Sequence, residues 1–97
     1  MSEIIQLKHD NLVDHFGGNM VLAVFSKEGC GACTQIKKHL ANLPDKYTVV
    51  IVDGLKHMAS KRYFPGGVKY YPTIGLYDNG YFKGEITQLN IINNQIE

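Results

Sequence analysis

Two nearly continuous apolar runs, separated by a helical pattern, constrain the fold of this chain more than any other feature. Residues 20–25 (MVLAVF) are almost entirely apolar, and residues 47–52 (YTVVIV) are rich in β-branched side chains. Such runs are typical of strands buried on both faces of a parallel sheet. Between them Cys33, Ile36 and Leu40 recur at helical spacing. We therefore expect two central parallel strands joined by a crossover helix.

Two shorter helices are predicted outside this unit. The first follows a strand at residues 3–7, can be capped by Asp10 and runs through Phe16. The second lies within residues 55–63 and is broken by Pro65-Gly66-Gly67. The expected apolar faces are Leu12, Val13 and Phe16 in the first helix, and Leu55, Met58, Ala59 and Tyr63 in the second.

The C-terminal part predicts a hairpin followed by a helix. Strands at residues 73–77 and 81–86 flank Asp78-Asn79-Gly80, a strong turn signal, so they should be antiparallel. Thr87 can cap a last helix, whose inward face would be Leu89, Ile92 and Ile96. The order βαβαβαββα predicts a three-layer α/β/α sandwich with a mixed central sheet.

Length and charge narrow the class of protein further. At 97 residues the chain suits one domain, residues 1–97, and its net charge of +1 comes from interspersed acids and bases. This pattern gives no basic stripe for nucleic acid and no patch for an anionic membrane surface. Because neither a signal peptide nor a membrane-spanning run is found, we expect a soluble, cytosolic monomer.

The two cysteines of the chain, Cys30 and Cys33, form a CxxC pair at the start of the predicted crossover helix. A helix N-terminus stabilises a thiolate, so Cys30 is the expected nucleophile. Lys27 would lower the Cys30 pKa further, whereas Glu28 would partly oppose it. Cys33 lies on the apolar side of the helix and is the expected resolving thiol. In a reducing compartment such a pair is expected to be redox-active.

Two other uses of the pair are less consistent with the sequence. A purely structural disulfide closing so short a loop would contribute only about 2 kcal/mol in the chain-entropy model. A zinc site needs at least three protein ligands, and the chain has no second CxxC. The histidines have no tight ligand spacing, so we expect no metal; they are His9, His15, His39 and His57.

Three stretches together, VLAVFSKEGCGAC, YTVVIVD and GVKYYPTIGLYDNG, resemble the thioredoxin/glutaredoxin superfamily across nearly the whole chain. The resemblance implies the thioredoxin fold and a cis peptide bond before Pro72, which would pack against the cysteine pair. It also implies that the backbone of Tyr71 pairs with an extended substrate segment. The corresponding substrate surface would comprise Lys27, Gly31, Ala32, Tyr71 and Pro72.

The sequence combines features of two branches of that superfamily. Thioredoxins have a tryptophan and a proline where this chain has Gly29 and Ala32. They also bury an aspartate and a lysine where Val24 and Val49 stand, so the resolving cysteine needs another proton route, through water or Glu28. Lys27 instead matches the glutaredoxin lysine that binds a glutathione carboxylate, although a solvated loop lysine is an equal interpretation.

The resemblance implies a small, divergent member of bacterial or phage type that reduces protein disulfides. Ribonucleotide reductase would be one family-typical client. No bound cofactor is expected beyond the redox-active Cys30–Cys33 disulfide, with glutathione as a possible co-substrate. Electrons would come from thioredoxin reductase or glutathione. The alternative function is a binding module or accessory subunit whose cysteines are incidental.

Overall fold

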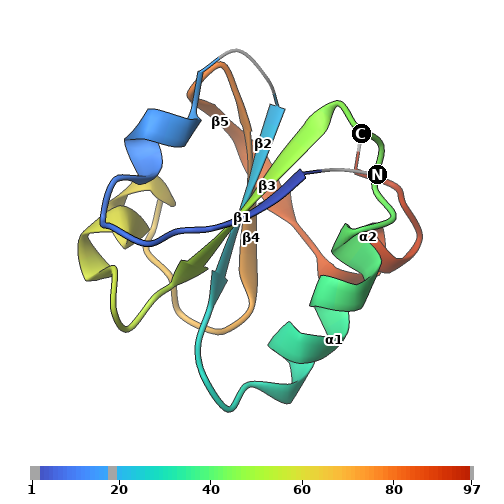
Figure 1. The fold of residues 1–97 in the computed structure, drawn as a ribbon, viewed down its shortest axis with the longest axis horizontal. Coiled ribbons are helices and arrows are strands. Elements are labelled where there is room, and N and C mark those ends of the chain that lie inside the picture. The colour runs from blue at the N-terminus through green and yellow to red at the C-terminus, as the bar shows by residue number, and fades with distance from the viewer. Residues whose placement is uncertain (1–2, 18–19, 97) are drawn as a thin grey trace.

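The computed structural model describes residues 3–17 and 20–96. It contains a five-stranded sheet of order β1-β3-β2-β4-β5, which runs through the middle of the molecule (Figure 1). β1 and β2 are both parallel to β3, whereas β4 is antiparallel to β2 and to β5. The strands are β1 (Glu3–Gln6), β2 (Met20–Ser26), β3 (Tyr47–Asp53), β4 (Thr73–Asp78) and β5 (Tyr81–Ile86).

The two apolar runs form the central strands, as predicted. In β2, Leu22 pairs with Val49 of β3 on one side and with Leu76 of β4 on the other. β2 residues from Val21 onward are buried. An extended strand with neighbours on both edges and cover on both faces exposes no side to water, which explains its lack of apolar–polar alternation.

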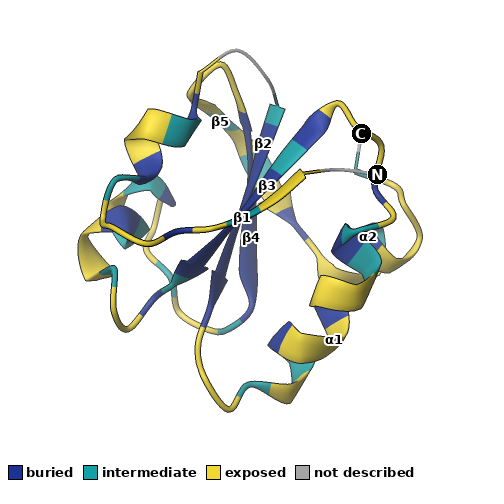
Figure 2. Ribbon diagram, in the orientation of Figure 1, coloured by how far each residue is buried: buried dark blue, intermediate teal, exposed yellow. Residues whose placement is uncertain are grey.

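Two α-helices cover one face of the sheet (Figure 1). They are α1 (Gly31–Leu40) and α2 (Gln88–Ile92), and their buried residues, dark blue in Figure 2, belong to one cluster with buried residues of the strands. No helix in the described part of the chain has the length and apolar character needed to cross a bilayer. The buried cluster on this face is Leu22, Val24, Ile36, Leu40, Leu43, Tyr47, Val49, Ile51, Ile74, Leu76, Ile86 and Ile91.

Two 3-10 helices, rather than α-helices, lie over the opposite face: η1 (Leu12–His15) and η2 (Met58–Tyr63). Aromatic contacts dominate this side, where Phe16 stacks on Tyr77 with ring centroids 4.6 Å apart. The Tyr77 hydroxyl donates a hydrogen bond of 2.6 Å to the carbonyl of Tyr63. Burial raises the Tyr77 pKa, so this hydroxyl remains a donor.

The predicted helix capped by Asp10 was wrong in length and in its cap. η1 is a single turn whose N-cap is Asn11, and Val13 is 52% exposed instead of packing inward. The Asp10 carboxylate accepts hydrogen bonds from the Ala59 N–H (3.1 Å) and the Ser60 hydroxyl. Asp10 therefore ties the β1–η1 connection to η2 instead of capping its own helix.

The predicted inward faces of the two later helices also need correction. Around η2, Leu55 and Met58 are exposed, at 61% and 63%. Tyr63 is partly buried against the core as predicted, and Phe64 supplies the buried contact. A 3-10 turn places side chains differently from an α-helix, so the helical spacing did not identify the buried face.

The last helix is capped by Thr87 as predicted, with a capping box to Asn90. Its buried residue is Ile91, whereas Leu89 and Ile92 are 64% and 49% exposed. Ile96, beyond the helix, is partly buried against the same cluster as predicted. Only five residues are helical, so a face extrapolated over 89–96 has no continuous helix to occupy.

The hydrogen bonds of Asp10 to Ala59 and Ser60 predict a pH-dependent contribution to the stability of the fold. The Ser60 hydroxyl, and secondarily the Ala59 N–H, lower the pKa of the Asp10 carboxyl below its ordinary 3.8. A lowered native pKa stabilises the fold at pH above 3.8, and this stabilisation is lost as pH falls through the native value. Asp10→Asn should therefore be less stable than the parent in urea at pH 6, with the difference shrinking by pH 3.

Glu3→Gln is the control, because it removes an exposed carboxylate for which the structure shows no comparable network. A stability difference for Asp10→Asn that stays constant from pH 6 to pH 3 would contradict the proposed linkage.

Candidate active site

The fold places Cys30 at the N-terminus of α1, where it is the N-cap residue. Its backbone is extended, and its Sγ accepts a hydrogen bond of 3.2 Å from the N–H of Cys33. The first turn of α1 contains no acidic side chain. The unpaired amides and dipole of a helix N-terminus favour an anion at this position. The geometry thus suits Cys30 as a thiolate.

The two cysteines differ in their access to solvent. Cys33 is 2% exposed, whereas Cys30 is half-buried. Their Cα atoms are 5.2 Å apart and their sulfurs are joined as a disulfide, a spacing within the usual range. An incoming substrate can therefore approach Cys30 more readily, and Cys33 is held within reach of it.

Pro72 lies immediately before β4, and the Tyr71–Pro72 peptide bond is cis, as the family resemblance implies. Register brings this segment toward the cysteine loop, because Thr73 of β4 pairs with Phe25 near the end of β2. Pro72 itself is buried. The loop before β4 and the approach to α1 thus meet at the same end of the sheet.

Tyr71 connects that loop with the residues before the cysteines. The Lys27 ammonium lies 5.6 Å from the centroid of the Tyr71 ring, a cation–π arrangement. Tyr71 also packs over Gly54, which follows β3 and donates its N–H to the Ser26 carbonyl at 2.8 Å. Lys27 therefore contacts Tyr71, one of the residues of the expected substrate surface.

Tyr70, in contrast, is 55% exposed and points its hydroxyl toward β5. That hydroxyl donates a hydrogen bond to the Glu85 carboxylate, which raises the Tyr70 pKa. This contact links the loop before β4 to the edge strand.

The close contact between Gly54 and Tyr71 predicts that a larger residue at position 54 would displace the Tyr71 ring. A Cβ at position 54 would lie 2.6 Å from Cε1 of the Tyr71 ring, so Gly54→Ala must displace the ring. Overpacking of this kind costs about 1–3 kcal/mol. We expect this loss in urea denaturation, together with a change in the reactivity of Cys30 as Lys27 loses its aromatic contact.

Gly17→Ala is the matched control, because a Cβ at this exposed glycine meets no atom within 4 Å. If Gly54→Ala were as stable as Gly17→Ala, the Tyr71 ring would not be fixed as the structure indicates.

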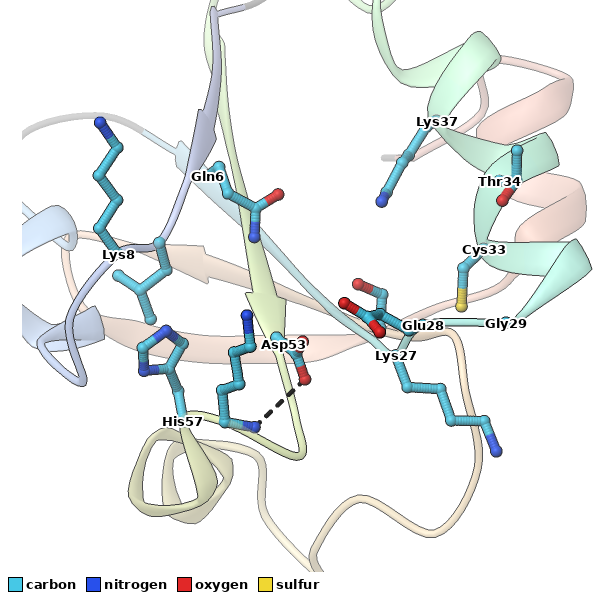
Figure 3. Close-up of a pocket in the computed structure, with 13 residues that line it drawn as sticks. Gln6, Lys8, Lys27, Glu28, Gly29, Cys33, Thr34, Lys37, Asp53 and His57 are labelled. Atoms are coloured by element: carbon cyan, nitrogen blue, oxygen red, sulfur yellow. Dashed lines mark hydrogen bonds between the residues drawn. The ribbon is translucent and has the colours of Figure 1, made fainter.

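A polar cavity of about 540 Å³ lies beside Cys33 (Figure 3). Cys33 and Lys37 reach it from α1, and Asp53 and His57 reach it from the end of β3 and the following loop. Sequence reasoning missed Lys37, Asp53 and His57 as neighbours of Cys33. The available signal was the parallel arrangement of β1, β2 and β3, because the carboxyl ends of parallel strands share one edge.

The candidate residues therefore do not all line this cavity. Tyr71 and Pro72 lie on the side of the cis peptide bond and do not line the cavity. Gly31 and Ala32 are the first two residues of α1, exposed and half-buried respectively. Lys27 contacts both regions, because it lines the cavity but directs its ammonium away from it (Figure 3).

Within residues 3–17 and 20–96, no group of three or more His, Cys, Asp or Glu side chains is arranged to hold a metal ion.

No protein-family model and no curated protein sequence matches the chain. Among the solved structures that resemble it is a Schistosoma mansoni thioredoxin: 22% identity and a TM-score of 0.77, over 97% of this chain and 93% of that one. A single-residue mutant of a thioredoxin from Halobacterium salinarum also has 22% identity and a TM-score of 0.77, over 100% and 96%. Zinc-bound human ERp44 has 17% identity and a TM-score of 0.71, over 96% of this chain and 30% of ERp44.

These similarities, together with the mixed sheet of order β1-β3-β2-β4-β5, show that the chain has the thioredoxin fold. At such identities the likeness concerns the fold alone. The activity must be argued from the cysteine site.

Proposed function

We propose that this protein is a thiol–disulfide oxidoreductase of the thioredoxin/glutaredoxin type that reduces disulfides in other proteins. The observation that carries the proposal is the asymmetric cysteine pair. Cys30 caps α1 and accepts the Cys33 N–H, while Cys33 is 2% exposed. The Cys30 thiol is therefore activated and accessible, whereas the Cys33 thiol is buried and reacts only in the second step.

In the proposed reaction the Cys30 thiolate attacks one sulfur of a substrate disulfide. A mixed disulfide forms, and the first substrate thiolate leaves. The Cys33 thiolate then attacks Sγ of Cys30, which releases the second substrate thiolate and forms the Cys30–Cys33 disulfide. The substrate gains two electrons and the protein loses two.

The substrate surface of this proposal comprises Gly31, Ala32 and the Tyr71–Pro72 segment, with Lys27 beside it. An extended substrate segment would pair with the backbone of Tyr71, as in strand addition. The Lys27 ammonium over the Tyr71 ring supports a role in binding a carboxylate next to the substrate disulfide. We assign the activity to a reducing, cytosolic setting, in which the dithiol is regenerated continually.

The electron donor is the finer part of the proposal. Lys27 favours glutathione, whereas the overall fold is equally suited to thioredoxin reductase. The test supplies oxidised protein with NADPH and either thioredoxin reductase or glutathione plus glutathione reductase, with insulin as substrate, and follows NADPH consumption. Turnover with one system assigns the donor; insulin left intact with both systems and with dithiothreitol would overturn the function. Ribonucleotide reductase is the client protein that the family resemblance implies. Reduction of a disulfide-bearing peptide from that enzyme would test this client.

A further inference from the structure

Resting on that proposed function, we infer that the Glu28 carboxylate is the proton acceptor for the Cys33 thiol in the resolving step, acting through water across the polar cavity. Glu28 and Cys33 both line this cavity. Figure 3 shows the Glu28 carboxylate directed into the space between Cys33 and Asp53.

The need for such an acceptor follows from the burial of Cys33. A thiol must lose its proton to attack the mixed disulfide, because the thiolate is the nucleophile. The sheet beneath α1 presents Val24 and Val49, both fully buried, in place of titratable groups. Within the described part of the chain, the buried polar or charged residues are Ser26, Ser60 and Thr73, none of which is a carboxylate.

The cavity provides the polar exit that the core lacks. A water molecule needs a polar site of roughly 10–15 Å³ by a comparable measure, so about 540 Å³ has room for several. Ser26 and Thr34 add hydroxyl groups to the lining. A proton leaving Cys33 can therefore pass to a carboxylate through water without crossing the core.

The hydrogen bonds of Asp53 favour Glu28 as the acceptor among the two carboxylates that line the cavity. Asp53 already uses Oδ1 to accept the N–H groups of Leu55 (2.9 Å) and Lys56 (3.2 Å), which holds it in the turn after β3. Lys37 follows Cys33 by one turn of α1 and favours a thiolate there. Besides Glu28 and Cys33, the titratable residues that line the cavity are Lys8, Lys27, Lys37, Asp53, Lys56 and His57.

The proposed step balances as follows. The Cys33 proton passes through water to Glu28, and the sulfur of Cys33 bonds to Sγ of Cys30. The bond between Cys30 and the substrate sulfur breaks, and its electron pair leaves with that sulfur. Glu28 then returns its proton to solvent, so it is regenerated in each cycle.

A purely electrostatic role for Glu28 makes the opposite prediction. A negative charge near Cys33 disfavours its thiolate, so removing the charge alone would speed resolution. Removing a proton acceptor would slow it. The sign of the effect of Glu28→Gln therefore separates the two roles.

The experiment mixes the reduced protein with 5,5′-dithiobis(2-nitrobenzoate) in a stopped-flow instrument. The first thionitrobenzoate is released when Cys30 attacks, and the second when Cys33 resolves the mixed disulfide. For Glu28→Gln we expect little change in the first phase and a second phase slower by about ten- to a hundredfold at pH 7, at or below the low end of general-base effects because Glu28 is exposed.

The pH profile supplies a readout that a structural role would not change. Without the acceptor, the second phase should rise in proportion to hydroxide concentration, more steeply than in the parent. Glu28→Asp should recover part of the rate, and Glu3→Gln, which removes an exposed carboxylate outside the cavity, should match the parent.

Two failures are distinguishable. A second phase in Glu28→Gln that is as fast as in the parent, or faster, overturns the role of Glu28 while leaving the dithiol function intact. Absence of the first phase in the reduced parent overturns the proposed function itself.

Discussion

Cys30→Ser should reduce the rate of insulin-disulfide reduction to the rate measured without protein, and Cys33→Ser should stop the cycle after one attack. A serine hydroxyl at position 30 does not ionise near neutral pH, so the helix N-terminus has no thiolate to stabilise. Cys33 cannot substitute for it, because Cys33 is 2% exposed and points to the interior side of α1. The measurement is insulin precipitation with dithiothreitol as reductant.

Cys33→Ser provides the informative comparison with Cys30→Ser. It keeps the Cys30 thiolate but lacks the resolving thiol, so a long-lived mixed disulfide should accumulate and be visible by intact-mass spectrometry. Circular dichroism checks that both variants fold. If Cys30→Ser kept full function in a cellular assay, the protein would be a binding module or accessory subunit with incidental cysteines.

Much of the fold was predictable from burial and turn chemistry. β2 and β3 are recognised because strands buried on both faces lose apolar–polar alternation. The β4–β5 hairpin is recognised because Asn79 and Gly80 both adopt positive φ, 51° and 87°, conformations that Asn and Gly tolerate. These signals are local and depend little on the surrounding structure.

The elements that were mispredicted depend on contacts between distant segments. Asp10 reads as a helix cap from its neighbours, yet its carboxylate bonds to Ala59 and Ser60, about 50 positions later. Likewise, Ile91 rather than Leu89 faces the core because one short turn of α2 docks on the sheet. Local periodicity contains no information on such docking.

The same distinction applies to the candidate site. The cysteine spacing and the proline before β4 are linear motifs and can be recognised in the sequence. The cavity depends on the approach of residues 6–8, 26–37 and 53–57. The position of Tyr71 depends on the missing side chain at Gly54. Neither relation has a signature within a single segment, so both required the structure.

The second large effect concerns the apolar core beneath α1. Val24→Asp should destabilise the protein by about 3–5 kcal/mol at pH 7, the cost of leaving a buried charge unpaired. Val24 is fully buried, with 0% of its surface exposed, between Ile51 of β3 and Ile74 of β4. Such a loss is a large part of the roughly 5–15 kcal/mol typical of small domains. Urea denaturation measures it.

The pH dependence identifies the charge as the cause. Burial raises the pKa of the introduced carboxyl in the folded state above its unfolded value of about 3.9. The penalty is therefore smallest below that value, where the carboxyl is neutral in both states, and grows as pH rises to the native pKa. Val24→Asn, polar but uncharged, should carry a penalty that does not vary with pH. Equal pH profiles for the two variants would mean that water or a cation reaches position 24, and that the core beneath Cys33 is not the apolar barrier that makes an external proton acceptor necessary.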